Sequence, residues 1–277
     1  MTATSNETTQ PLVRVENLVK YYSKKKLVGS AEEVRALDGV SFSIFRGTTL
    51  AIVGESGSGK STLALCLACL EGPTSGNIWF EETDLSGLRE KDRRVIRRQV
   101  QLIFQDPVNS FNPRWSVLEV LTEPLVVQGY LGHEEMKSRA HALLEQVALP
   151  RRLGEKLPSE LSGGQRQRIA IARALNLGPK LLILDEALSA LDCSVQAQIA
   201  NLLMDLQVSL GMTYLFISHD LAMAGYLADE IAVMSRGRIV EQGAPEGVLR
   251  QPESKITREL LAAVPRLDFT RSPLEEP

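Results

Sequence analysis

The amino-acid sequence predicts an α/β fold in which helices cover a mostly parallel β-sheet and a helical insertion interrupts the middle of the chain. Short apolar segments alternate with helical patterns on both sides of the centre, which is typical of consecutive βα units. Between residues 106 and 159 the pattern changes to helices joined by loops, including the turn-rich stretch DPVNSFNPRWS. A glycine-rich loop directly after an apolar strand is a third observation, because such loops join a strand to a helix in α/β proteins.

The first half of the chain is expected to contain short strands and two helices. Val13–Leu18 alternates between apolar and polar residues, as a half-buried strand does, and the lysine-bearing residues 23–33 are expected to form a loop. An apolar helix is expected over Ser61–Leu70, ended by a Gly-Pro pair, and a charged helix over Arg89–Arg98. The other expected strands are Val40–Phe45, Thr49–Val53, Asn77–Phe80 and Val100–Phe104.

From Leu181 onward strands and helices alternate again, which completes the predicted sheet. The long helix in this half is expected over Val195–Leu210. The expected strands are Leu181–Leu184, Thr213–Ser218, Ile231–Met234 and Arg238–Glu241.

Composition limits the class of protein. The 277 residues are 44% hydrophobic, enough for a sizeable core, and the formal net charge of −3 gives no overall attraction to nucleic acid or to an anionic membrane. The three cysteines are too few and too unevenly spaced for a disulfide framework, which indicates a reducing compartment. The first ten residues lack the apolar segment of a signal peptide, and no window approaches the roughly 18 apolar residues of a membrane span. We therefore expect a cytoplasmic protein that meets a membrane only through partner proteins.

Residues 54–61 match the phosphate-binding pattern G-x-x-x-x-G-K-[ST], and they lie between an expected strand and an expected helix, as this pattern requires. The glycines let backbone N–H groups close around phosphate oxygens, and the N-terminus of the following helix adds partial positive charge. Lys60 is expected to reach the β- and γ-phosphates, and the Ser61 hydroxyl to bind Mg²⁺. The expected phosphate-binding residues are Gly54, Glu55, Ser56, Gly57, Ser58, Gly59, Lys60, Ser61 and Thr62.

Such a loop needs a carboxylate at the end of a neighbouring strand to hold the metal. LLILDE supplies one, because four apolar strand residues are followed by Asp185. Glu186 comes next and is expected to orient an attacking water or to accept its proton. An apolar run that ends in Asp-Glu is weak evidence for a metal-binding strand on its own. Together with the phosphate-binding loop it is strong evidence.

Further motifs follow in a fixed order. After the phosphate-binding loop come Gln105 in LIFQDP, LSGGQ at 161–165, LLILDE, SALD at 189–192 and His219 in FISHD. Together these motifs resemble the nucleotide-binding subunit of an ATP-binding cassette (ABC) transporter over about residues 12–265. The stretches GESGSGKSTLA, FQDPVNSFNPR, SVQAQIANLL and TRELLAAVP are most similar to ATPase subunits of bacterial dipeptide, oligopeptide and nickel importers.

The resemblance implies an ABC ATP-binding domain over residues 11–265. Its fold would be a P-loop ATPase core with a mostly parallel sheet, a small antiparallel β part and a helical subdomain inserted at about 106–165. Residues 1–10 and 266–277 would be flexible tails. ATP and Mg²⁺ are the implied ligands.

The resemblance also implies a role for each matching residue. Tyr22 falls where the family places an aromatic ring that stacks on adenine, with the neighbouring Tyr21 as the alternative. Gln105 would contact Mg²⁺ and the attacking water, His219 would hydrogen-bond the γ-phosphate, and Asp192 would lie at the interface between two such subunits. The implied catalytic residues are Glu186, His219, Gln105 and Lys60, and the implied metal ligands are Ser61, Gln105 and Asp185.

LSGGQRQR at 161–168 predicts a second anion site at the start of a helix, made by Ser162, the backbone of Gly163 and Gly164, and Gln165. The chain's own phosphate-binding loop already surrounds its nucleotide, and a motif attached to the insertion cannot easily fold onto it. We therefore expect two subunits arranged head to tail, each closing the other's nucleotide. A homologous ATPase is the favoured partner, which gives a heterodimer, and a second copy of this chain is the alternative.

The resemblance implies an ATP-hydrolysing, energy-coupling subunit of an importer for peptides or a related small solute. Such a subunit binds two transmembrane permease subunits at the cytoplasmic side of the bacterial inner membrane and serves an extracytoplasmic solute-binding protein indirectly. Nucleic acid is not an expected partner. The alternative is a soluble ABC ATPase that acts on nucleic acid or ribosomes, but those relatives carry two cassettes, a long coiled coil or zinc-binding cysteines. A small-molecule kinase would leave LSGGQ unexplained.

Two details bear on turnover and on coupling to the membrane. The family usually has proline after the catalytic glutamate, whereas this chain has Ala187, so we expect a less constrained Glu186 carboxylate. After Gln105, the segment contains Phe111 and Trp115, which we expect to be exposed and to form a groove for a short cytoplasmic helix of a permease.

Two weaker patterns have ordinary structural explanations. Cys66 and Cys69 lie on an apolar helix with no second pair to complete a metal site, so core packing is expected. The basic run REKDRRVIRRQ contains acidic residues and a narrow apolar stripe of Val95 and Ile96, so it is expected to be a solvated helix face rather than a nucleic-acid site.

Overall fold

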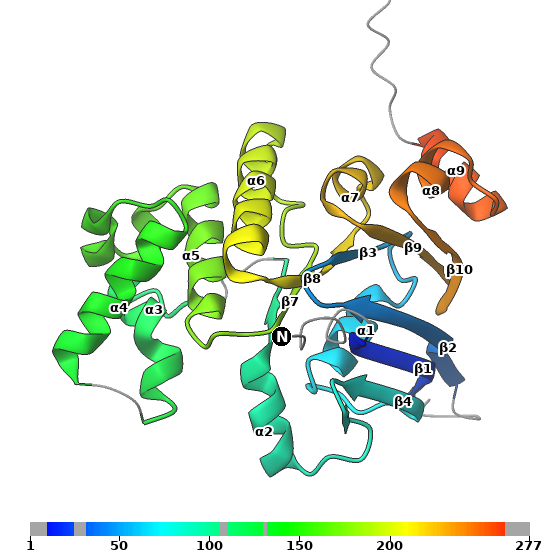
Figure 1. Ribbon diagram of the computed structural model, residues 1–277, viewed down its shortest axis with the longest axis horizontal. Helices are drawn as coiled ribbons and strands as arrows, with labels where there is room; N and C mark the ends of the chain where they lie inside the picture. Colours follow the sequence, from blue (N-terminus) through cyan, green and yellow to red (C-terminus); the bar gives the residue numbers. More distant parts are fainter. Residues whose placement is uncertain (1–9, 25–31, 106–109, 130–131, 264–277) are drawn as a thin grey trace, which may run out of the picture.

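The computed structural model describes residues 10–24, 32–105, 110–129 and 132–263. The smaller of its two sheets contains β1 (Pro11–Lys24), β2 (Glu32–Phe45), β4 (Ser75–Phe80) and β5 (Thr83–Asp84). Figure 1 shows this sheet at one end of the molecule and the helices α3 (Val117–Val126) and α4 (His133–Gln146) at the other. The larger sheet lies between them.

The larger sheet has six strands in the order β10-β9-β3-β8-β7-β6. Its strands are β3 (Thr49–Val53), β6 (Val100–Ile103), β7 (Leu181–Asp185), β8 (Thr213–Ser218), β9 (Glu230–Ser235) and β10 (Arg238–Gly243). Five of them run parallel, and β10 is antiparallel to β9. The predicted mostly parallel sheet is therefore confirmed. Because the carboxyl ends of parallel strands meet at one edge, the segments that follow β3, β6, β7 and β8 come together there.

Both faces of the larger sheet are covered, and neighbouring residues of a strand belong to different cores. In β3, Leu50 and Ile52 pack into the core shared with α1 (Lys60–Leu67) and the small sheet. Ala51 and Val53 pack into the core on the opposite face. A strand that is buried on both faces has no polar side, which explains why the central strands are continuous apolar runs in the sequence.

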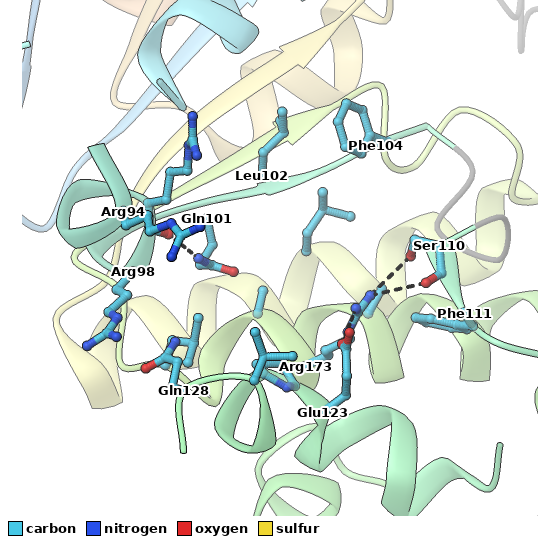
Figure 2. A pocket seen from close by; sticks show the side chains of 17 residues that line it. Arg94, Arg98, Gln101, Leu102, Phe104, Ser110, Phe111, Glu123, Gln128 and Arg173 are labelled. Atoms are coloured by element: carbon cyan, nitrogen blue, oxygen red, sulfur yellow. Dashed lines mark hydrogen bonds and ion pairs between the residues drawn. The ribbon is translucent and has the colours of Figure 1, made fainter. Parts of the chain in front are cut away.

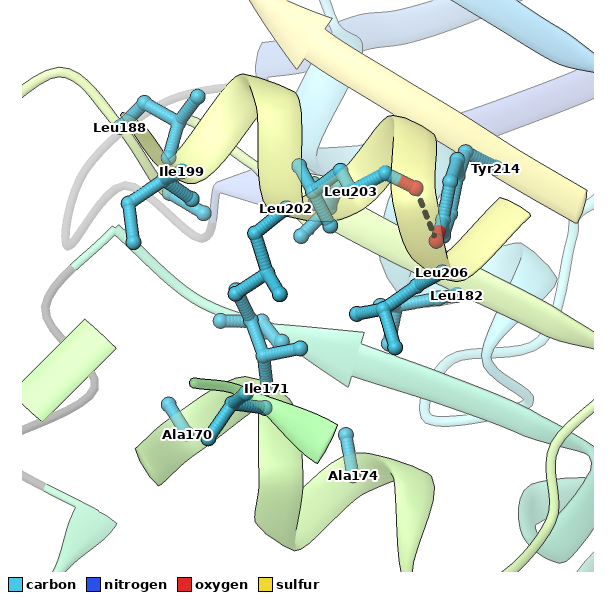
Figure 3. Packing of buried hydrophobic residues seen from close by; sticks show 14 of the residues in the cluster. Ala170, Ile171, Ala174, Leu182, Leu188, Ile199, Leu202, Leu203, Leu206 and Tyr214 are labelled. Atoms are coloured by element: carbon cyan, nitrogen blue, oxygen red, sulfur yellow. Dashed lines mark hydrogen bonds between the residues drawn. The ribbon is translucent and has the colours of Figure 1, made fainter. Parts of the chain in front are cut away.

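The second core joins the larger sheet to α5 (Gly163–Leu175) and α6 (Cys193–Leu210). Figure 3 shows apolar side chains of both helices meeting those of the sheet, with the Tyr214 ring buried among them. The Tyr214 hydroxyl donates a hydrogen bond to the Leu203 carbonyl at 2.9 Å, which satisfies its polar atom inside the core. This core runs from the sheet into the helical insertion without a break.

The small sheet is antiparallel, as the resemblance implied, but its first two strands are much longer than expected. Each has 14 residues, so the expected limits Val13–Leu18 and Val40–Phe45 were wrong, and so was a loop starting at Ser23. Apolar alternation marks only the parts of these strands that cover the core. The polar outer parts are held by backbone pairing, as between Tyr22 and Val34. The remainder of the expected loop lies outside the described residues.

The other helices of the core are α2 (Glu90–Gln99), α7 (Leu221–Leu227), α8 (Pro245–Arg250) and α9 (Lys255–Ala263). Helix α1 ends earlier than the sequence predicted because Cys69 has a left-handed φ of +55°, which stops the helix. Helix α2 is a solvated helix, as expected: Ile96 is its buried residue, whereas Val95 is 56% exposed.

The described residues between 110 and 162 form α3, α4 and short 3-10 turns, so the helical insertion is confirmed there. Ser116 caps α3, because its hydroxyl accepts from the Glu119 N–H while the Glu119 carboxylate accepts from the Ser116 N–H. Within the described ranges no helix is long and apolar enough to cross a bilayer.

Candidate nucleotide-binding site

The segments that follow β3, β6 and β7 meet around one cavity of about 430 Å³. The lining residues are Val34, Arg35, Ala36, Ser56, Gly57, Gly59, Lys60, Ser61, Thr62, Gln105, Asp185 and Glu186. Motifs far apart in the sequence therefore form a single site. The residues contributed by β2 were missed by sequence analysis, because no motif marks them and only the path of this strand beside the phosphate-binding loop brings them here.

Two glycines hold the phosphate-binding loop against neighbouring strands. A Cβ at Gly54 would lie 2.1 Å from the Met234 carbonyl oxygen, and a Cβ at Gly59 would lie 2.2 Å from the Ala36 carbonyl oxygen. Gly59 also has a φ of +108°, which side chains rarely allow. Close backbone approach thus explains the motif's first and last glycines in this fold.

Lys60 is buried at the start of α1, where its ammonium donates to the carbonyl oxygens of Gly54 and Glu55, both at 2.8 Å. Burial lowers the pKa of Lys60, and three nearby carboxylates oppose that effect. The ammonium can exchange these neutral acceptors for phosphate oxygens, with which its hydrogen bonds would be stronger. The chemistry expected of Lys60 therefore fits its position.

Ser61 and Asp185 place two oxygens side by side at the edge of the cavity. The Ser61 hydroxyl donates to Asp185 Oδ1 at 3.2 Å. Burial raises the pKa of Asp185, and the negative charge of Glu186 raises it further. A hydroxyl and a carboxylate are suitable ligands for Mg²⁺, and a bound cation would favour the ionised carboxylate that burial disfavours. These residues fit the metal that the sequence assigned to them.

Glu186 lines the same cavity although it directly follows Asp185. Consecutive residues of a strand normally point to opposite faces. Glu186 instead has a left-handed φ of +49°, which turns its side chain toward the cavity, and its N–H donates to the Ile217 carbonyl at 2.9 Å. Its carboxylate lies 3.5 Å from His219 Nδ1, so His219, at the end of β8, stands beside the carboxylate rather than among the lining residues.

The turn after Glu186 is held by hydrogen bonds, although Ala187 stands where the family usually has proline. The backbone N–H and the hydroxyl of Ser189 both donate to the Glu186 carbonyl oxygen, at 3.1 and 2.8 Å. Ala187 is 1% exposed. These contacts constrain the turn, although the alanine in place of proline had suggested a less constrained Glu186.

Gln105 reaches the cavity from the end of β6, where the helical insertion begins. Its side-chain amide donates to Ser189 Oγ at 3.3 Å. Residues 106–109, which follow, lie outside the described ranges. Gln105 therefore joins the expected metal site to the start of the insertion.

Tyr22 and Tyr21 lie beside the cavity without lining it. Tyr22 is paired with the lining residue Val34 across β1 and β2, and its hydroxyl donates to the Glu71 carboxylate. Burial, followed by this hydrogen bond, raises the pKa of Tyr22 to about 12. The Tyr21 ring lies under the Arg35 guanidinium at 5.2 Å. Stacking of Tyr22 on adenine stays a prediction, with Tyr21 as its alternative.

The LSGGQ segment starts α5, as predicted. The Gln165 N–H donates to Ser162 Oγ at 3.3 Å, and the Ser162 N–H donates to Gln165 Oε1 at 3.0 Å. A Cβ at Gly164 would lie 2.7 Å from Val195 Cγ1 of α6. Asp192 caps that helix by accepting from the Val195 N–H at 2.9 Å. The segment and Asp192 are thus linked to each other, and neither is among the residues that line the cavity described above.

A second cavity, of about 590 Å³, lies between α2 with β6 and α3 with α5. Figure 2 shows Arg94 and Arg98 of α2 on one side of it and Arg173 of α5 beside Phe111 on the other. Phe111 is 6% exposed and lies under the Arg173 guanidinium at 5.9 Å, so the expectation of an exposed Phe111 was wrong. Its ring belongs to the core and anchors the start of the insertion.

Unlike Phe111, Trp115 does not line this cavity. It is 36% exposed and lines a separate cavity of about 810 Å³ between α3 and α4. The single groove expected from both aromatic residues was therefore wrong, because Phe111 and Trp115 line separate cavities. The exposed apolar residues that line the second cavity are Phe104 and Val127. We name this second cavity, lined by residues of α2, β6, α3 and α5, the arginine groove.

Cys66 and Cys69 are buried in the core with α1, as core packing predicted. Burial raises the pKa of the Cys66 thiol to about 11, which makes it a poor nucleophile. Among the described residues no cluster of three or more His, Cys, Asp or Glu side chains could hold a metal ion.

Comparison with known proteins identifies the family of the chain. A family profile described as ABC transporter matches residues 37–189. The chain is 45% identical to the dipeptide transport ATP-binding protein DppF of Escherichia coli, over 94% of this chain and 78% of that protein. It is 49% identical to the oligopeptide transport ATP-binding protein OppD of Mycobacterium tuberculosis, over 94% of this chain and 43% of that protein.

Solved structures give the same result. The structure is similar to the ATP-binding cassette MJ0796 in a dimeric, post-hydrolysis state with ADP and Pi, with a TM-score of 0.74 and 32% identity over 84% of this chain and 98% of that one. It is also similar to cbiO1 from Clostridium perfringens, part of an ABC transporter complex, with a TM-score of 0.75 and 31% identity over 92% and 96% of the two chains. The sequence motifs, the parallel sheet with its inserted helices and these similarities together show that the chain belongs to the ABC transporter family, as an ATP-hydrolysing cassette.

Proposed function

We propose that this cassette supplies the energy for an importer of peptides or of a related small solute. The observation that carries the proposal is the 45 to 49% identity to dipeptide and oligopeptide transport ATP-binding proteins across 94% of the chain. In the described structure, the charged helix α2 does not support a nucleic-acid role. Its Glu90 and Asp92 form ion pairs with arginines, so the helix does not present a purely basic surface.

Each group of residues at the cavity has a separate proposed role in ATP hydrolysis. The loop backbone and Lys60 would hold the phosphates of ATP, while Ser61, Asp185 and Gln105 would hold Mg²⁺, which would supply positive charge against the phosphates. Glu186 accepts the proton of the attacking water, or orients it. His219, whose Nδ1 lies 3.5 Å from that carboxylate, would hydrogen-bond the γ-phosphate.

The partners follow from the second anion site and from the relatives. We infer that a second cassette closes the nucleotide through its own LSGGQ segment, with a homologous ATPase favoured over a second copy of this chain. Two permease subunits would hold the pair at the cytoplasmic side of the bacterial inner membrane. An extracytoplasmic solute-binding protein would select the solute.

Reconstitution of the complete complex tests the proposal. The cassette should co-purify with two permeases, and the solute-binding protein loaded with a dipeptide should raise ATP hydrolysis several-fold above the rate with the empty binding protein. The solute that co-purifies should be a peptide or a molecule of similar size. Stimulation by RNA or ribosomes, with no response to a loaded binding protein, would contradict it.

We further infer that the arginine groove receives a cytoplasmic segment of a permease. Its floor is apolar, and Val127 on its edge is 76% exposed. A Val127→Lys change adds charge to an apolar contact, so permease binding should weaken about tenfold or more. Pull-down of the permeases by tagged cassette measures this.

Val126→Lys is the matched control. Val126 is 55% exposed, but it lines only the cavity that contains Trp115. It should leave permease binding intact, and both variants should bind ATP normally. Weakened binding by both variants would place the permease over Trp115 instead, because Val127 lines that cavity as well.

A further inference from the structure

Ser189 occupies a central position among the expected catalytic groups, and neither the motif assignments nor the comparisons give it a role. Its hydroxyl donates to the Glu186 carbonyl oxygen at 2.8 Å and accepts from Gln105 Nε2 at 3.3 Å. A single hydroxyl therefore touches the backbone that carries Glu186 and the side chain that reaches toward the metal ligands.

The hydroxyl also determines which way the Gln105 amide faces. A serine hydroxyl has one proton and two acceptor lone pairs. Because that proton is committed to the Glu186 carbonyl, Ser189 Oγ can only accept from Gln105. Gln105 must then present its NH₂ group to Ser189, which leaves Oε1 on the other side of the amide. No described residue donates to that oxygen, and the Gln105 side chain lines the cavity beside Asp185.

The orientation matters because Mg²⁺ binds oxygen and not an amide nitrogen. An amide held in the other orientation would offer its NH₂ group to the metal and block it. The same hydroxyl supports the left-handed conformation of Glu186, whose φ is +49°. Such a conformation persists only where surrounding contacts hold it.

We propose that Ser189 is a positioning residue that orients Gln105 Oε1 toward the metal and holds the Glu186 turn, so that both groups face the same nucleotide. This inference rests on the proposed roles of Glu186 and Gln105. It assigns Ser189 no contact with substrate.

The test uses the full chain in its assembled complex, with Ser189→Ala, Ser189→Thr and a matched control. Ser189→Ala should lower kcat about tenfold, as is typical for loss of an outer-shell partner. The KM for ATP should stay within about twofold, because Ser189 contacts Gln105 and Glu186 rather than the loop and Lys60 that are expected to hold the phosphates. The Mg²⁺ concentration needed for half-maximal binding of a non-hydrolysable ATP analogue should rise. Ser189→Thr keeps the hydroxyl and should recover most of both properties.

Ser209→Ala is the control, because Ser209 also donates its hydroxyl to a backbone carbonyl, that of Asp205 at 2.7 Å, but on the exposed side of α6. It should leave kcat and the Mg²⁺ requirement unchanged. Ser189→Cys, nearly the same size and a much weaker donor, should resemble Ser189→Ala and serves if the alanine variant is unstable.

A double variant separates this proposal from a purely structural role. In a Gln105→Ala background, Ser189→Ala should cost clearly less than in the wild-type chain, because the amide that Ser189 orients is gone. Wild-type kcat and Mg²⁺ requirement in Ser189→Ala, or full additivity in the double variant, would overturn the inference. The Glu186→Gln variant separates the two ways of failing. Normal turnover in Glu186→Gln would contradict the proposed function of the site as well. Lost turnover in Glu186→Gln, together with a wild-type Ser189→Ala, would contradict only the role of Ser189.

Discussion

A Glu186→Gln variant is expected to bind ATP normally and to hydrolyse it at least about a hundredfold more slowly, because a general base contributes about 10²- to 10⁴-fold. The amide keeps the size and position of the carboxylate but cannot accept a proton. We do not expect Asp185 to replace it, since its carboxylate accepts from the Ser61 hydroxyl and is the proposed metal ligand. Steady-state turnover and nucleotide retention in the complete complex measure the effect.

The same variant should accumulate in a closed complex with ATP trapped between two cassettes. Glu259→Gln is a suitable control, because this carboxylate lies on the exposed C-terminal helix α9 and pairs only with Lys255 among the described residues. It should retain full turnover. Near-normal turnover in Glu186→Gln would remove Glu186 from the catalytic role.

A Gly163→Asp variant is expected to leave this chain's own ATP affinity unchanged while hydrolysis at the partner's site falls by about a thousandfold. Two like charges about 4 Å apart near a protein surface repel by about 4 kcal/mol, and the new carboxylate would meet the partner's γ-phosphate. Nucleotide binding to the isolated cassette, and hydrolysis by the assembled pair, measure the two effects separately.

The structure makes Gly163 the suitable position for this change. A Cβ there would lie 3.4 Å from Leu191 Cδ2, which is ordinary contact, whereas one at Gly164 would clash with Val195. An aspartate in the first turn of a helix is also favourable for the helix itself. Gly163→Ala adds a methyl group without charge, so it should retain more hydrolysis at the partner's site than Gly163→Asp. Loss of ATP affinity by the isolated Gly163→Asp cassette would show that the segment acts within its own subunit.

The parts of the site that could be predicted are those encoded by short local patterns. The phosphate-binding loop needs glycine at positions where a Cβ atom would clash with the carbonyl oxygens of Met234 and Ala36, so its spacing is visible in the sequence. Asp185 and Glu186 could be placed because a buried strand must end where its apolar run ends. The parallel order of β3, β8 and β7 then brings both segments to one edge.

The parts that could not be predicted depend on long-range pairing. Val34 and Arg35 line the cavity only because β2 extends far beyond its apolar stretch and passes the loop. Phe111 looked exposed because it lies in a turn-rich segment, yet Arg173 and the core cover it. Ser189 belongs to the SALD motif, but its role could not be predicted, since that role depends on a contact with Gln105, 84 positions away.

The contact between Gly164 and Val195 has a consequence for communication between two paired cassettes. With no space for even a methyl group there, the start of α5 cannot tilt without displacing the start of α6. Helix α6 begins directly after the turn that contains Glu186 and Ser189. A phosphate held against LSGGQ by the partner would thus bias the geometry of this chain's own catalytic turn. By thermodynamic reciprocity, occupancy of either site would then alter the affinity of the other, so that the pair would respond to ATP cooperatively rather than as two independent enzymes.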